Sequence, residues 1–153
     1  MSSRLPRTTA RDAPENLAIL LREPFQAMTD VLLDRLADRG HGAVRQPHAA
    51  VFEFLDDDGT RVSVLAERAR ITKQSMAELV AHLERHGYVA RAPDPGDRRA
   101  KIVRATAKGR EVYAIARETT TELEARLADA LGERELGRLR ALLARAGEVL
   151  AAR

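Results

Sequence analysis

The fold is decided by residues 64–89, VLAERARITKQSMAELVAHLERHGYV. Ser63 can cap a short helix over 64–69, because a hydroxyl can accept a hydrogen bond from the free N–H groups of a first turn. After a tight turn of two residues, Thr72 can cap a second helix that runs to about His86. Two short helices joined in this way are typical of a helix-turn-helix.

The second helix of this pair has two faces of different character. Apolar residues at three- and four-residue steps predict its core side, namely Met76, Leu79, Val80 and Leu83. The opposite face carries Gln74, Ala77, Glu78, Ala81 and Arg85. A helix that reads bases in the major groove needs small or hydrogen-bonding side chains at its leading end. The first turn supplies them, with Lys73, Gln74 and Ser75.

A basic hairpin is predicted directly after this pair. Two β-like stretches cover residues 88–92 and 101–105. Between them residues 93–100 read PDPGDRRA, where proline and glycine predict a turn. Arg98 and Arg99 make this turn basic.

Long helices are predicted on both sides of this unit. Apolar residues recur at helical spacing over 15–39, and Pro24 is expected to break or kink that helix because it lacks an N–H. A short helix follows over 47–55. Two further helices are expected over 107–151, separated at Gly132.

The leucine-rich faces of the terminal helices need a partner surface. One small helix-turn-helix lobe cannot cover them, and uncovered they would form a large apolar patch. Association into a twofold homodimer is the economical solution. The alternative is a monomeric bundle in which these helices pack only on one another.

Charge is unevenly distributed along the chain, whose net charge is +3. Residues 61–110 hold twelve Lys and Arg against five Asp and Glu, whereas 1–60 hold seven against ten and 111–153 seven against eight. A basic central segment fits a lobe that binds a polyanion. The alternative is a solvated charged face.

The composition argues against several classes of function. The 153 residues include no cysteine, which rules out disulfides, zinc–thiolate sites and thiol-based redox sensing. The four histidines lack the spacing of a metal site, so neither a metal nor a cofactor is expected. No Gly-rich phosphate loop or nucleophile elbow is present, so an enzyme is not predicted.

A cytoplasmic location is expected. No apolar run approaches the length of a membrane span, so no membrane partner is predicted. Residues 1–14 have basic residues without an apolar segment behind them, and we expect a flexible tail rather than a signal peptide.

Residues 64–89 resemble the helix-turn-helix of the MarR family, and 94–109, DPGDRRAKIVRATAKG, resemble its wing and the start of the next helix. The resemblance implies a mainly α fold with a small β-hairpin, a winged helix-turn-helix lobe and N- and C-terminal dimerisation helices. It places one domain over 15–153, with the lobe at about 47–106 and the dimerisation helices at 15–39 and 107–151. Ala105 departs from the family, which often has leucine there.

The resemblance also implies roles for individual residues. The second helix would enter the major groove and the hairpin arginines would reach toward the minor groove. The implied DNA contacts are Thr72, Lys73, Gln74, Ser75, Ala77, Glu78, Arg98, Arg99 and Lys101. Asp97 resembles the family's wing aspartate, which orients a neighbouring arginine by pairing with it.

Members of the family often bind small aromatic or anionic effectors between the dimer lobe and the DNA lobe. The candidate lining residues are apolar groups with a few polar ends: Phe25, Met28, Arg45, His48, Phe52 and Tyr113. The alternative for this set is ordinary core packing.

The sequence therefore predicts a homodimeric, sequence-specific regulator of transcription, a repressor or an activator, that binds a palindromic operator in double-stranded DNA. Release from DNA by a small-molecule effector is the expected mode of control. The alternative is a winged-helix module that binds other proteins and has no DNA specificity. The basic segment and its arginine tip favour DNA.

Overall fold

Residues 16–152 are described by the structure, a computed structural model, and they form six α-helices, one 3-10 helix and one hairpin. In chain order the elements are α1 (Leu17–Asp38), η1 (Gln46–His48), α2 (Ala49–Phe54), α3 (Val62–Ala69), α4 (Lys73–Arg85), β1 (Val89–Asp94), β2 (Asp97–Ala105), α5 (Ala107–Leu131) and α6 (Glu133–Ala151). The predicted fold class is confirmed. The predicted tail, 1–14, lies outside the described residues, and the division into lobe and dimerisation helices stays a prediction.

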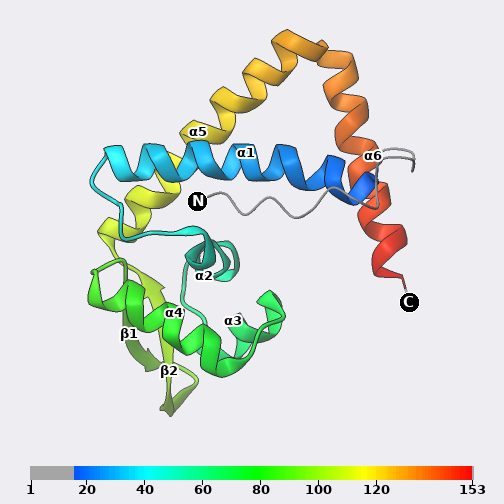
Figure 1. The fold of residues 1–153 in the computed structure, drawn as a ribbon. Helices are drawn as coiled ribbons and strands as arrows, with labels where there is room; N and C mark the ends of the chain where they lie inside the picture. Colours follow the sequence, from blue (N-terminus) through cyan, green and yellow to red (C-terminus); the bar gives the residue numbers. More distant parts are fainter. Residues whose placement is uncertain (1–15, 153) are drawn as a thin grey trace, which may run out of the picture.

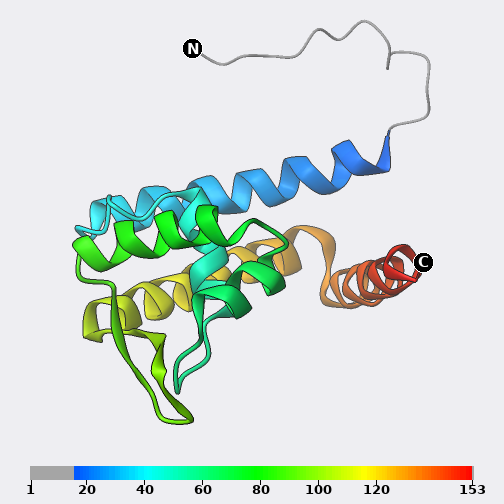
Figure 2. The same cartoon turned by 90° about the horizontal axis from the view of Figure 1, so that it is seen from below.

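The helix-turn-helix and the hairpin lie together at one end of the molecule (Figures 1 and 2). α1 packs along α5, and α6 turns back from the far end of α5. Within the described part of the chain, α6 packs chiefly on α5, and Leu136 near their junction is its one buried residue. α6 therefore leaves most of its length open.

α1 is a continuous helix, so the chain does not break at Pro24. The helix starts at a cap in which the Asn16 side chain accepts a hydrogen bond from the Ala18 N–H at 2.9 Å. Proline removes one N–H from the ladder, which frees the carbonyl of Leu20. Because both Pro24 and Leu20 are exposed, water can satisfy that carbonyl.

The start of α4 confirms the predicted cap, because Thr72 Oγ1 accepts a hydrogen bond from the Ser75 N–H at 3.1 Å. The turn before it is made by Arg70, which adopts the left-handed conformation with φ 55°. The predicted cap of α3 is wrong: the helix begins at Val62, and Ser63 lies inside it.

The earlier start of α3 follows from a contact distant in sequence. Thr60 and Val103 exchange two backbone hydrogen bonds, of 2.9 and 2.8 Å. This bridge ends the extended segment at Thr60 and leaves the next residues free to begin a helix. Such a contact is not visible in local sequence patterns.

The core joins both helices of the helix-turn-helix to the hairpin and to the ends of α1 and α5. Its buried side chains include Leu36, Val51, Leu65, Met76, Val80, Leu83, Tyr88, Val103, Val112 and Ile115. Three of the four residues predicted for the core side of α4 are fully buried, and Leu79 is half-buried. The recognition-helix candidate is therefore held by the face that the spacing predicted.

The hairpin is longer than predicted. β1 and β2 pair in antiparallel fashion, with Pro93 opposite Lys101 and Asp94 opposite Asp97. The predicted turn over 93–100 is wrong, because only Pro95 and Gly96 lie between the strands. The turn is this tight because the Asp94 carboxylate accepts a hydrogen bond from the Gly96 N–H at 2.8 Å.

Candidate nucleic-acid interface

The leading turn of α4 presents polar side chains to solvent. Lys73, Gln74 and Ser75 are exposed, and so are Thr72 and Glu78. The Gln74 amide nitrogen lies 3.4 Å from the Glu78 carboxylate. With half-buried Ala77, the α4 residues proposed to contact DNA share one exposed face. An amide and a carboxylate one turn apart can offer both donors and acceptors to base edges.

The hairpin carries the second group of predicted contacts. Arg98, Arg99 and Lys101 are all exposed on β2. None of the three forms an ion pair within residues 16–152, so their charges face solvent unneutralised. Three free cations on a projecting hairpin are suited to contacts with phosphates.

Asp97 contacts the backbone of a neighbouring arginine. Its carboxylate accepts a hydrogen bond from the backbone N–H of Arg99 at 3.0 Å. No ion pair joins Asp97 to an arginine side chain of the described residues, and its role in orienting an arginine stays a prediction. The tight turn brings the Arg99 backbone to the carboxylate and leaves both guanidinium groups outside.

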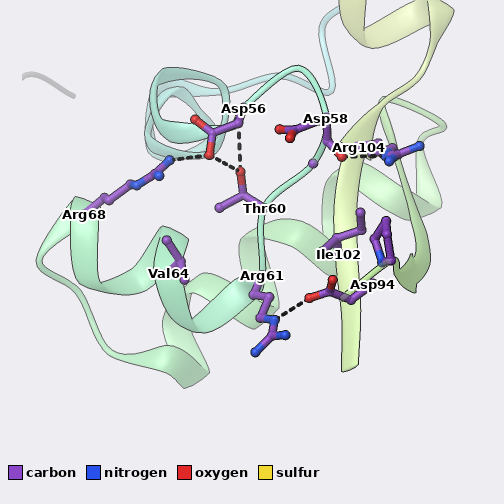
Figure 3. Close-up of a pocket in the computed structure, with 11 residues that line it drawn as sticks. Asp56, Asp58, Thr60, Arg61, Val64, Arg68, Asp94, Ile102 and Arg104 are labelled. Atoms are coloured by element: carbon purple, nitrogen blue, oxygen red, sulfur yellow. Dashed lines mark hydrogen bonds and ion pairs between the residues drawn. The ribbon is translucent and has the colours of Figure 1, made fainter. Parts of the chain in front are cut away.

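Two residues that local patterns did not indicate join the hairpin to α3. Arg61 Nε donates to the Asp94 carboxylate at 2.6 Å, across a hollow (Figure 3). Asp94 precedes Pro95-Gly96, a signal for an aspartate that binds its own turn. Nothing in the sequence near Arg61 indicated its partner.

The hairpin base is tied to α4 as well. Arg91 on β1 donates to Glu84 near the end of α4 at 3.1 Å. The helix and the wing therefore form one connected unit, in which the exposed face of α4 and the three free cations of β2 belong to the same end of the molecule (Figure 1).

A separate cavity lies between α1, α2 and α5. Its volume is about 330 Å³, and its lining is mostly apolar. Four of the six predicted effector residues line it: Phe25, Arg45, Phe52 and Tyr113. The cavity size falls at the lower end of the range of small-molecule sites.

Met28 and His48 do not line this cavity, so the structure does not bring the predicted six together. Met28 borders a different groove, between α1 and α5. His48 is buried beside α4, where its ring stacks on His82. Both differences have one cause. Helical spacing shows which residues share a face of a helix, but only the packing of neighbouring elements shows which cavity that face lines.

The hydroxyl of Tyr113 is already engaged. It donates to the Phe52 carbonyl oxygen at 2.8 Å. Burial, with a smaller contribution from Asp57, raises the pKa of Tyr113 to about 12, so the phenol is neutral at physiological pH. Among the predicted residues that line the cavity, Arg45 is the one cation.

Residues 16–152 form neither a metal site nor a membrane-spanning helix. No group of three or more His, Cys, Asp or Glu side chains is placed to hold a metal ion. None of the helices is both long enough and apolar enough to span a membrane.

Comparisons with known sequences identify relatives. A family model described as the MarR family matches residues 44–100. The transcriptional regulator HosA of Escherichia coli O111:H- is 33% identical over 120 residues, which are 78% of this chain and 79% of HosA.

Solved structures with the same fold cover most of the chain. Streptococcus pneumoniae FabT, solved in complex with DNA, has a TM-score of 0.75 at 17% identity and matches 88% of this chain and 95% of its own. CouR from Rhodococcus jostii RHA1, bound to p-coumaroyl-CoA, has a TM-score of 0.65 at 22% identity and matches 84% and 90%. At these identities the likeness concerns the fold.

Proposed function

The chain belongs to the MarR family of transcriptional regulators, and we propose that it acts as a homodimer that binds a specific sequence in duplex DNA. α4 enters the major groove, and the hairpin arginines reach phosphates and the minor groove. FabT, which shares the fold, was solved in complex with DNA. This precedent supports the proposal.

The observation that carries the proposal is the pairing of two surfaces at one end of the molecule. One is the exposed, hydrogen-bonding first turn of α4, around Gln74. The other is the set of exposed cations on β2, Arg98, Arg99 and Lys101. Base recognition needs the first kind of surface and phosphate attraction needs the second.

Dimerisation is supported by exposed apolar residues on the terminal helices. The protomer leaves large side chains open on α1, α5 and α6: Leu17, Leu20, Leu21, Phe25, Leu127, Leu131, Leu139, Leu142, Leu143, Val149 and Leu150. Such a set on a lone protomer would be a large exposed patch, which a second copy can cover. A twofold dimer would then match a palindromic operator.

The cavity of about 330 Å³ is the proposed effector site. Its apolar lining suits an aromatic ring, and Arg45 supplies a cation at its border. CouR, which shares the fold, was solved bound to p-coumaroyl-CoA. A small aromatic anion is therefore the proposed ligand class, and its binding would release the DNA.

Two other roles compete with this one. An enzyme is not proposed, since the family consists of transcriptional regulators. A winged-helix module for protein partners would not need unneutralised arginines on the hairpin, and the free charges of Arg98 and Arg99 favour DNA.

The test of the proposal is selection from a pool of random-sequence duplexes, using the purified full chain. A DNA-binding dimer should enrich one palindromic site, and that site should compete with bulk DNA in a mobility shift. A protein-binding module would shift no duplex even at low salt, and this result would contradict the proposal.

A further inference from the structure

A hollow separates part of the hairpin from the segment that leads into α3. Its volume is about 530 Å³, and its walls include Asp56, Asp58, Arg61, Arg68, Asp94 and Arg104 (Figure 3). Because side chains do not fill the hollow, close packing does not fix this part of the hairpin. Its position relative to the helices therefore depends on specific links across the gap.

The base of the hairpin has several links, among them the ion pair of Arg91 with Glu84 on α4. Thr60 and Val103 exchange two backbone hydrogen bonds, of 2.9 and 2.8 Å. Arg104 Nε donates to the Asp58 carbonyl oxygen at 2.7 Å. These contacts hold β2 at residues 103–104 and leave the outer part of the hairpin free to bend.

The outer part of the hairpin has one link. Of the hydrogen bonds and ion pairs within residues 16–152, only Arg61 Nε to Asp94 Oδ2, at 2.6 Å, joins residues 93–101 to the helices. The other Asp94 oxygen accepts the Gly96 N–H at 2.8 Å. The side chain of Asp94 is 15% exposed. The Asp94 carboxylate thus holds the turn closed and links it to Arg61, at the N-cap position of α3.

The charge of Asp94 favours its ion pair with Arg61. The hydrogen bond from Gly96 and the one from Arg61 lower the pKa of Asp94, so the carboxylate is ionised at physiological pH. A charged pair with one well-shielded partner is stronger than a fully exposed pair.

We infer that Arg61 is a positioning residue for the wing: by holding Asp94, it sets the angle at which Arg98 and Arg99 meet DNA. The inference rests on the proposed DNA contacts of those two arginines. A hairpin held in place loses less conformational entropy when it binds than one that must first be ordered.

Simple electrostatics predicts a different outcome for the same residues. Asp94 is an anion near a DNA-binding tip, so its removal would strengthen DNA binding if net charge alone mattered. If Arg61 holds the wing through Asp94, removal of the carboxylate should instead weaken DNA binding. Asp94→Asn keeps an oxygen for the Gly96 N–H and removes the charge that Arg61 holds, so this substitution separates the two accounts.

The experiment titrates a fluorescently labelled duplex of mixed sequence with the full chain and its variants. Asp94→Asn and Arg61→Gln should each weaken binding about threefold to fivefold, and Arg61→Lys should restore most of the affinity. The exchanged pair Arg61→Asp/Asp94→Arg should recover binding relative to either half alone. Thermal midpoints should stay close to wild type, because the pair lies outside the core.

Arg68→Gln is the matched control. Arg68 pairs with Asp56 at 2.8 Å on the same hollow, is 40% exposed against 44% for Arg61, and makes no hairpin contact (Figure 3). The Arg68→Gln variant loses the same charge as Arg61→Gln and should weaken DNA binding less. Equal losses for both would mean that charge alone acts and would overturn the inference.

Unchanged or tighter DNA binding by Asp94→Asn overturns the inference. Arg99→Ala, measured alongside, tests the proposed function separately: if it leaves affinity intact, the wing contacts themselves are wrong.

Discussion

The imidazole rings of His48 and His82 are stacked, with centroids 4.2 Å apart and planes inclined by 13°. His48 Nδ1 accepts a hydrogen bond from the Arg45 N–H, and His82 Nε2 lies 2.8 Å from the Ala43 carbonyl oxygen. The stack therefore ties the segment before α2 to the recognition-helix candidate. Burial, and next the neighbouring His82, lower the pKa of His48 to about 4.

The first prediction is a loss of stability at mildly acid pH. A histidine with a folded pKa of about 4 and an ordinary value of 6.5 binds its proton more tightly in the unfolded chain. The free energy of unfolding should thus be unaffected above pH 6.5 and fall as the pH drops toward 4, by on the order of 2 kcal/mol at pH 5. Chemical unfolding at a series of pH values measures it.

His48→Asn is the control for this effect. An asparagine can accept the Arg45 N–H and does not titrate. Carboxylates act at lower pH, since hydrogen bonds from Arg68 and Arg39 lower the pKa values of Asp56 and Glu118. If the variant loses stability between pH 6.5 and 5 as steeply as wild type does, the assignment to His48 is wrong.

The second prediction concerns Gly109, in the first turn of α5. A β-carbon there would collide with the carbonyl oxygen of Tyr88, which also accepts the Thr106 N–H at 3.0 Å. Gly109→Ala must push the hairpin base away from α5. We expect a loss of roughly 2–4 kcal/mol in unfolding free energy, measured by urea titration.

Gly137→Ala provides the opposite case. Gly137 is also helical, in α6, and a β-carbon there would meet nothing within 4 Å. Its replacement should stabilise by about 0.5–1 kcal/mol, because alanine favours a helix over glycine. Two variants with equal effects would show that the Tyr88 contact has no special cost.

A feature could be predicted from the sequence when the residues that form it lie close together in the chain. The core face of α4, the Thr72 cap and the exposed α4 face follow from spacing and cap chemistry over a few residues, and these predictions are confirmed. The cap of α3 is wrong because Thr60 pairs with a residue far along the chain, Val103. Local patterns hold no trace of such a contact.

The predicted sites divide in the same way. The α4 face and the hairpin cations are continuous segments, so the structure finds each group together. The effector set combined residues of several elements, and Met28 and His48 fell outside the cavity. Arg61 and Asp94 are 33 positions apart, and only the folded chain brings them into contact.

The third prediction is dimerisation through the terminal helices. Leu139 and Leu143 are 41% and 43% exposed on α6, so Glu at both sites should spare the protomer core. The double variant should sediment as a folded monomer, with unchanged circular dichroism. Arg134→Glu, at a side chain 93% exposed, changes the net charge equally and should stay dimeric. A wild type that sediments as a monomer would contradict the prediction.

The fourth prediction tests the cavity with p-coumarate as the probe. Arg45→Ala should weaken its binding in calorimetry by about tenfold, since a charge-assisted hydrogen bond contributes about 1.5 kcal/mol or more. Met28→Ala, outside the cavity, should leave it unchanged. If wild type binds neither p-coumarate nor benzoate, the proposed ligand class is wrong.

The fifth prediction separates the wing from the recognition helix. Arg99 should contact phosphate or the minor groove, which carries charge attraction and little base identity. Gln74, exposed in the first turn of α4, should bond a base edge, a contact that discriminates by about 1–3 kcal/mol. Arg99→Ala should therefore weaken binding to all duplexes, and Gln74→Ala should weaken binding to the operator alone.

The most direct test of DNA reading by α4 and the wing is the salt dependence of affinity for both variants, on the selected operator and on mixed-sequence duplex. We expect Arg99→Ala to lower both affinities and to flatten their dependence on salt, because fewer counterions are released. Gln74→Ala should lower operator affinity alone and keep the slope. Equal losses on both duplexes for Gln74→Ala, or an unchanged slope for Arg99→Ala, would contradict these roles of α4 and the wing.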